Sequence, residues 1–117
     1  LDAWWTERSV GRPALGETYE LFFGDAYDWR AKVTRCEAGR AFELTITRSD
    51  DDWNGTTVGI ELAETAFGTA VRFSHCGWPS ANDHFRTSSF CWAMYLRLMK
   101  RFIETGERVP YAVRLDA

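Results

Sequence analysis

Apolar and polar residues alternate with a period of two over most of the stretch from residue 17 to residue 75. The alternation is typical of half-buried β-strands. It falls into five segments separated by short turns, at residues 17–23, 29–34, 42–47, 58–62 and 69–75. Consecutive strands joined by short turns form an antiparallel meander. Asn54-Gly55, between the third and fourth segments, predicts a type I′ hairpin turn.

The pattern changes to a helical period after Pro79. A stripe of residues then recurs at intervals of three and four, at Phe85, Ser89, Trp92, Leu96, Met99 and Ile103, all of them apolar except Ser89. This spacing places them on one stripe of a helix of about 24 residues. Ser80 or Asn82 is suited to begin the helix and Gly106 to end it. Because one helix cannot cover five twisted strands, the sheet is expected to curl around it.

The first fifteen residues carry a weaker pattern. Residues 1–7 fit the end of a helix, which Gly11-Arg12-Pro13 would break. No internal repeat or low-complexity linker divides the rest, so residues 1–117 are expected to form a single domain. The chain begins at Leu1 and in the middle of an element, and we expect further residues upstream.

Several short motifs resemble those of a known family. Gly68-Thr69 opens the last predicted strand, His75-x-Gly77 closes it, and Trp92 lies on the predicted inner face of the helix. Trp4-Trp5 and, loosely, Gly16-x-x-Tyr19 match further positions. The chain thus resembles the START-related SRPBCC superfamily, in the branch similar to the activator of the heat-shock chaperone ATPase. The resemblance implies an α+β helix-grip fold, in which a curved antiparallel sheet wraps around a long C-terminal helix over a hydrophobic cavity.

The sequence departs from this family at both ends. The first strand and most of the first helix of the family are absent from residues 1–117, so the domain is interpreted as N-terminally incomplete. An edge strand and part of the cavity wall would then be missing. At the other end, residues 109–117 extend beyond the usual end of the helix.

Aromatic residues make up 15% of the chain, with six Trp, eight Phe and four Tyr. Several of them fall on the predicted inner faces, and rings with one or two polar groups are typical of small-molecule pockets. We therefore predict a ligand cavity between sheet and helix. Its predicted lining is Trp4, Trp5, Trp29, Phe42, Leu44, Ile60, Phe73, His75, Trp78, Phe85, Ser89, Trp92 and Leu96. The alternative is that the rings fill this space and leave no room for a ligand.

His75 is the one weak candidate for a catalytic residue. It shares the inward face of its strand, where it could orient a ligand or act as a general acid or base. The alternative is a hydrogen-bonded core histidine. Cys76 cannot form a dyad with it, because neighbouring residues of a strand point to opposite faces.

No metal or cofactor is expected. Asp50-x-Asp52-x-Asn54-Gly55, followed by Glu61, matches the spacing of an EF-hand calcium loop. An EF-hand needs a helix on each side, whereas strand patterns flank this segment, so a charged hairpin tip is favoured. The His and Cys residues lack zinc-site spacing, and no phosphate loop, dinucleotide fingerprint or nucleophile elbow occurs.

Charge and cysteine content restrict the partners. The formal net charge of -3 disfavours a nucleic-acid partner, which would require a basic surface. No apolar run approaches the ~20 residues of a membrane span, so no membrane partner is expected either. The three cysteines are widely spaced and odd in number, which indicates reduced thiols and a cytoplasmic location.

These observations favour a binding module for a small hydrophobic or aromatic ligand over an enzyme, because catalytic motifs are missing. Two alternatives remain open. The domain could be a cyclase or hydrolase that uses the same cavity with His75 as acid or base, or it could be a chaperone-interacting domain, which would need an exposed apolar patch. A homodimer would cover the edges of a long hydrophobic sheet.

Overall fold

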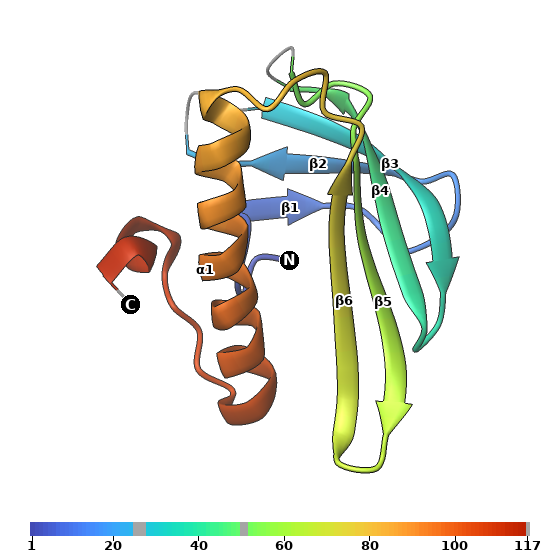
Figure 1. Cartoon of the computed structure of the whole chain (residues 1–117), viewed down its shortest axis with the longest axis vertical. Helices are drawn as coiled ribbons and strands as arrows, with labels where there is room; N and C mark the ends of the chain where they lie inside the picture. Colours follow the sequence, from blue (N-terminus) through green and yellow to red (C-terminus); the bar gives the residue numbers. More distant parts are fainter. Residues whose placement is uncertain (25–27, 50–51, 117) are drawn as a thin grey trace.

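The computed structural model describes residues 1–24, 28–49 and 52–116. In this part of the chain, six strands form one antiparallel sheet in chain order, and one long helix packs on its concave face (Figure 1). The strands are β1 (Arg8–Val10), β2 (Thr18–Phe22), β3 (Asp28–Glu37), β4 (Ala41–Arg48), β5 (Thr57–Thr65) and β6 (Gly68–Cys76). The helix α1 (Asp83–Thr105) is followed by a short 3-10 helix, η1 (Tyr111–Asp116). The predicted α+β helix-grip fold is confirmed.

The sheet curls strongly around the helix, as the sequence predicted. Figure 1 shows β1 and β2 running across the long axis of α1, whereas β5 and β6 run along it. The pairing of β3 with β4 shifts register twice, between Arg30 and Ala31 and between Val33 and Arg35. Such bulges bend a strand and increase its twist, so they contribute to the turn of the sheet from one direction to the other.

The core lies on the inner face of the central strands. Leu21, Ala31, Val33, Leu44 and Ile46 are each at most 1% exposed, and they alternate with partly exposed or exposed residues along β2, β3 and β4. The period-two prediction is therefore confirmed for these strands. Each of these side chains contributes hydrophobic stabilisation in proportion to its buried apolar area.

The strand β1 was not predicted. It consists of Arg8, Ser9 and Val10, and it pairs with the outer edge of β2, with Ser9 opposite Leu21. Three residues with exposed ends carry too little apolar periodicity to be recognised. The preceding residues form one turn around the carbonyl of Leu1, which accepts hydrogen bonds from the N–H groups of Trp4 and Trp5. The expected helix end is thus limited to that turn.

The hairpin of β5 and β6 continues beyond the core. Val58 is buried, but further along the hairpin Leu62 and Val71 are exposed, and Phe67 at the tip is fully exposed. In Figure 1 this half of the hairpin extends away from the other strands. Period-two alternation alone does not distinguish a buried strand from one that projects into solvent.

The turn between β4 and β5 differs from the predicted type I′ geometry. That turn requires positive φ at both central residues, whereas Gly55 has φ 80° and Asn54 does not have a positive φ. The connection is longer than a two-residue turn because it carries two buried side chains, Trp53 and Thr56. Insertion of these residues into the core explains the difference.

The helix begins and ends as predicted, but its buried face is rotated. Asn82 caps the start by accepting a hydrogen bond from the N–H of Phe85, and Gly106 ends the helix. The buried residues are Ser88, Trp92, Tyr95, Leu98 and Met99, whereas Ile103, on the predicted stripe, is 69% exposed. The rotation brings Tyr95 toward the C-terminal segment, which packs on this side of α1. In the described part of the chain, no helix is both long and apolar enough to cross a membrane.

Candidate functional site

A cluster of aromatic rings occupies the space between α1 and the sheet, where β3, the β4–β5 connection and the end of β6 face the helix, with Trp53 at its centre. Trp53 is 6% exposed. Its ring centroid lies 4.8 Å from that of Trp29 in β3 and 6.0 Å from that of Trp92 in α1. On the other side it meets the rings of His75 at 4.5 Å and Trp78 at 5.7 Å. Stacked, tilted and edge-to-face contacts of this kind add to the stabilisation from buried area.

Gly77 allows the chain to enter this cluster after β6. Its φ of 90° lies in the left-handed region, and a Cβ there would contact the backbone of Thr56 at 3.5 Å. A glycine adopts this conformation without strain. The resulting turn brings Trp78 back over Trp53.

His75 is held by hydrogen bonds at both ring nitrogens. The indole N–H of Trp92 donates to Nδ1 at 3.0 Å, and Nε2 lies 2.8 Å from the hydroxyl of Thr56. That hydroxyl donates its own proton to the carbonyl of Trp53 at 2.6 Å. Nε2 must therefore carry the ring proton and donate it to Thr56. Burial, with a smaller contribution from His84, lowers the pKa of His75 from 6.5 to about 4.

A second histidine, His84, lies in the first turn of α1. Its Nδ1 is 2.7 Å from a carboxylate oxygen of Asp52, in the connection between β4 and β5. The imidazole stacks on Trp53 with an interplanar angle of 22°. The carboxylate therefore fixes the ring orientation and links the start of the helix to the β4–β5 connection.

A partly open cavity of about 310 Å³ lies next to these rings. Rings from β3, α1, the first turn and two connections of the sheet line it: Trp5, Phe23, Trp29, Trp53, Trp92 and Tyr95. Polar groups of α1 also reach it, from His84, Thr87, Ser88 and Cys91. Tyr111 and Arg114 of η1 close one side. We call this space the ligand cavity, after the cavity that the sequence predicts between sheet and helix.

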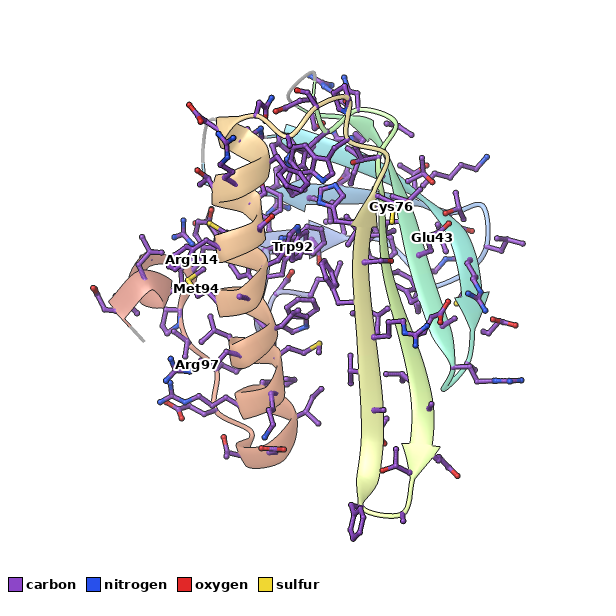
Figure 2. The ribbon with its side chains drawn as sticks, in the orientation of Figure 1. Glu43, Cys76, Trp92, Met94, Arg97 and Arg114 are labelled. Carbon is purple, nitrogen blue, oxygen red and sulfur yellow. The ribbon has the colours of Figure 1, made fainter. Side chains whose placement is uncertain are left out.

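A second space of about 360 Å³ lies on the other side of Trp92, between β6 and α1. Its apolar lining includes Phe73, Trp78, Phe85 and Leu96. We call it the β6 cavity. Ser88 and Trp92 line both spaces, so the Trp92 ring forms the partition between them. Figure 2 shows Trp92 pointing from α1 toward the sheet.

The described residues of the calcium-loop pattern have separate partners: Asn54 accepts a hydrogen bond from Ser49, and Glu61 accepts one from Arg35. Asp50 lies outside the described residues, and Asp52 is engaged with His84. Strands β4 and β5 flank the segment instead of helices. Among the described residues, no group of three or more His, Cys, Asp or Glu side chains is placed to hold a metal ion.

The comparisons with known proteins agree with this architecture. Residues 1–104 match the family model described as Activator of Hsp90 ATPase homolog 1-like protein. The chain belongs to this family. The resemblance to the SRPBCC branch of the chaperone ATPase activator is thereby confirmed. Tyr111 and Arg114 of this Hsp90 ATPase activator-like domain lie outside the matched range.

Solved structures show the same fold. The Aha1 dimer from Colwellia psychrerythraea, determined in solution, has a TM-score of 0.80 and 25% identity, covering 91% of this chain and 79% of that one. A crystal structure of a Staphylococcus saprophyticus protein has a TM-score of 0.74 and 20% identity, covering 92% of this chain and 76% of that one. No curated protein matches the sequence.

The predicted cavity residues of this activator-like domain are distributed over several places. Trp5, Trp29 and Trp92 line the ligand cavity. The β6 cavity takes in Phe73, His75, Trp78, Phe85, Ser89, Trp92 and Leu96.

The remaining predicted residues lie away from both cavities. Trp4 stacks on Trp5 at 6.2 Å. Leu44 is in the core, and Phe42 packs edge-on against Tyr19. Ile60 is half-buried in β5 opposite Phe73.

Sequence reasoning missed several residues of the ligand cavity. His84, Ser88, Cys91 and Tyr95 recur at intervals of four, three and four along α1, so a mixed polar stripe on the helix was the available signal. Trp53 was hidden within an acidic turn motif. Tyr111 and Arg114 follow the end of the helix, where no periodicity marks them.

Proposed function

We propose that this domain binds a small hydrophobic or aromatic ligand in the ligand cavity. The observation that carries the proposal is the space of about 310 Å³ that the rings leave between α1 and the sheet. Small-molecule pockets have volumes from about 300 to 1,000 Å³ and combine apolar walls with a few polar groups. The space corresponds to about ten water molecules at about 30 Å³ each, so a bicyclic aromatic compound is the expected size class.

The wall chemistry supports an aromatic ligand. An aromatic ring system that buries about 150 to 250 Å² gains about 4 to 6 kcal/mol from removal of apolar area from water. Association costs offset part of this gain. We therefore expect neutral bicyclic aromatics to bind weakly, with dissociation constants from about 0.1 mM to several millimolar.

The experiment is a titration with 1-naphthaleneacetamide, followed by tryptophan fluorescence and calorimetry. Cys91 lines the ligand cavity only, and Ser89 lines the β6 cavity only. A Cys91→Phe variant fills the first space and should abolish binding, whereas the matched Ser89→Phe variant should bind as the unmodified domain does. Equal affinities in the two variants, or an absence of saturable binding, would overturn the proposal.

The enzymatic alternative receives less support from the surroundings of His75. A general acid or base needs a ring nitrogen within reach of the substrate. Both nitrogens of His75 are engaged with Trp92 and Thr56. A cyclase or hydrolase based on His75 would have to break one of these bonds in every turnover.

We also propose that two copies of the domain associate through the exposed half of the β5–β6 hairpin. Leu62, Phe67 and Val71 present apolar surface there, and in the described chain no strand pairs with the outer edge of β6. Exposed strand edges and apolar patches are typical of interaction sites. The dimeric state of the Colwellia psychrerythraea protein supports a second copy as the occupant.

The description of the family suggests a heat-shock chaperone as the alternative partner for this hairpin.

We propose a cytoplasmic location for the domain. The three cysteines support it, because none of them forms a disulfide and unpaired thiols are typical of reducing compartments.

A further inference from the structure

The C-terminal segment adds a positively charged wall to the ligand cavity. After α1 the chain returns along the helix, and η1 places Tyr111 and Arg114 at the cavity. Arg114 donates from Nε to the hydroxyl of Tyr95 at 3.1 Å and from Nη1 to the carbonyl of Tyr111 at 2.7 Å. Its guanidinium also lies 3.7 Å from the centroid of the Tyr111 ring. Figure 2 shows Arg114 beside α1, where this segment returns.

These contacts orient Arg114 without neutralising it. A tyrosine hydroxyl, a carbonyl and a ring face are all uncharged partners, and burial raises the pKa of Tyr95 to about 12, so its hydroxyl stays protonated. In the described part of the chain, no carboxylate forms an ion pair with Arg114. Two of its nitrogens donate in these bonds, and a guanidinium has five N–H donors. Donors therefore remain for a ligand.

The other described residues of the lining carry no compensating negative charge. Among the residues that the structure describes, no Asp or Glu lines the ligand cavity, although the protein has a net charge of -3. The imidazole of His84 is engaged with the carboxylate of Asp52, and Arg114 supplies the positive charge on the cavity wall. The hydroxyls of Thr87 and Ser88 are further donors on its wall. An anion therefore finds donors and a positive charge here, with apolar rings beside them.

We infer that the ligand is an aromatic carboxylic acid, with its ring system among the tryptophans and its carboxylate bound by Arg114. This inference rests on the proposed ligand-binding function. A guanidinium and a carboxylate form charge-assisted hydrogen bonds, which are stronger than neutral ones. The acid should therefore bind more tightly than a neutral compound of the same shape.

The test compares matched acids and amides built on naphthalene, biphenyl and indole rings, each as the acetic acid and the acetamide. Calorimetry at pH 7 should give about tenfold tighter binding for the acid of the best pair, which corresponds to about 1.4 kcal/mol. Arg114→Met should reduce the acid-to-amide ratio to about one, and Arg114→Lys should keep most of the preference. Arg97→Met is the control, since Arg97 is exposed on α1 and lines neither cavity.

The outcomes separate the inference from the function on which it rests. Equal affinity for acid and amide in the unmodified domain overturns the acid assignment and leaves the proposed function standing. If the Arg114→Met variant still prefers the acid to the amide, the assignment is also overturned, because another group would then supply the positive charge that binds the carboxylate. If none of the pairs binds, both proposals fail. The quantity to compare is the ratio of the affinities for the acid and the amide. A change in the position of η1 would weaken the binding of both compounds and leave this ratio unchanged.

Discussion

The indole N–H of Trp92 donates a 3.0 Å hydrogen bond to Nδ1 of His75. This bond joins the middle of α1 to the end of β6 and fixes the orientation of the ring that separates the two cavities. It also determines which nitrogen of His75 carries the proton, because Nδ1 can only accept while Trp92 donates. The position of the helix on the sheet and the protonation state of the histidine are thus coupled.

A double-mutant cycle should measure this coupling. Trp92→Phe removes the donor, His75→Phe removes the acceptor, and the double variant removes both. The free energies of unfolding of the unmodified domain and the three variants, from urea titrations followed by circular dichroism, should give an interaction energy of about 1 kcal/mol. A coupling indistinguishable from zero would mean that the bond adds nothing to stability in solution.

The free energy of unfolding should also depend on pH through His75. The unfolded chain takes up a proton with the ordinary pKa of 6.5, whereas the folded state resists protonation down to about 4. Since the unfolded state binds more protons in this window, stability is fully present above pH 6.5 and falls as the pH is lowered toward 4. The measurement is the urea midpoint at a series of pH values, combined with NMR titration of the imidazole.

His75→Gln is the control for this pH dependence. It removes the titrating group while keeping a side chain that can donate and accept hydrogen bonds. The decrease in the urea midpoint between pH 6.5 and 4 should be smaller in this variant. An unchanged decrease would assign the pH dependence to other groups, and an NMR pKa near 6.5 would contradict the burial of His75.

The central strands could be predicted because their local pattern and their tertiary environment agree. Trp29, Ala31 and Val33 alternate with polar residues, and the structure buries all three. The same alternation continues to Leu62 and Val71, which are exposed. The apolar–polar alternation of a strand indicates which residues share one of its faces. Whether that face is buried depends on whether another element covers it. For this reason the fold was predictable and the extent of the core was not.

The composition of the ligand cavity was harder to predict for a related reason. Trp53 comes from a turn and Arg114 from a segment after the helix, and both contribute through contacts distant in sequence. The predicted inward stripe of α1 was partly right: Trp92 and Met99 are buried, and Phe85, Ser89 and Leu96 line the β6 cavity. Tyr95, which packs against η1 through Arg114, was not predicted. A prediction from the helix pattern alone could not include that packing.

Changes at the projecting hairpin should alter association without altering folding. Phe67→Ser and Val71→Lys replace exposed apolar groups, so each should change the free energy of unfolding by less than about 0.5 kcal/mol. If two copies meet at this hairpin, each change should raise the dissociation constant of the dimer at least about tenfold. Light scattering coupled to size-exclusion chromatography over a range of concentrations provides the measurement.

Leu15→Ser is the matched control for the hairpin variants. Leu15 is also highly exposed, but it lies between β1 and β2. It should leave the oligomeric state unchanged. A monomeric unmodified domain at all concentrations would contradict the homodimer, and binding of a chaperone that the hairpin variants lose would assign the surface to that partner.

Replacement of Tyr111 should weaken ligand binding more than it weakens the fold. The ring centroid of Tyr111 lies 6.3 Å from that of Phe23 and 3.7 Å from the guanidinium carbon of Arg114. No residue of η1 is buried, however. Tyr111→Ala should therefore cost at most about 1 kcal/mol of unfolding free energy. The ligand cavity would lose one wall and the support of its positive charge, so the affinity for 1-naphthaleneacetate should fall by about tenfold or more. Val113→Ala, an exposed change in the same segment, should leave the affinity unchanged. If Tyr111→Ala binds the acid normally, the segment does not form part of the binding site in solution.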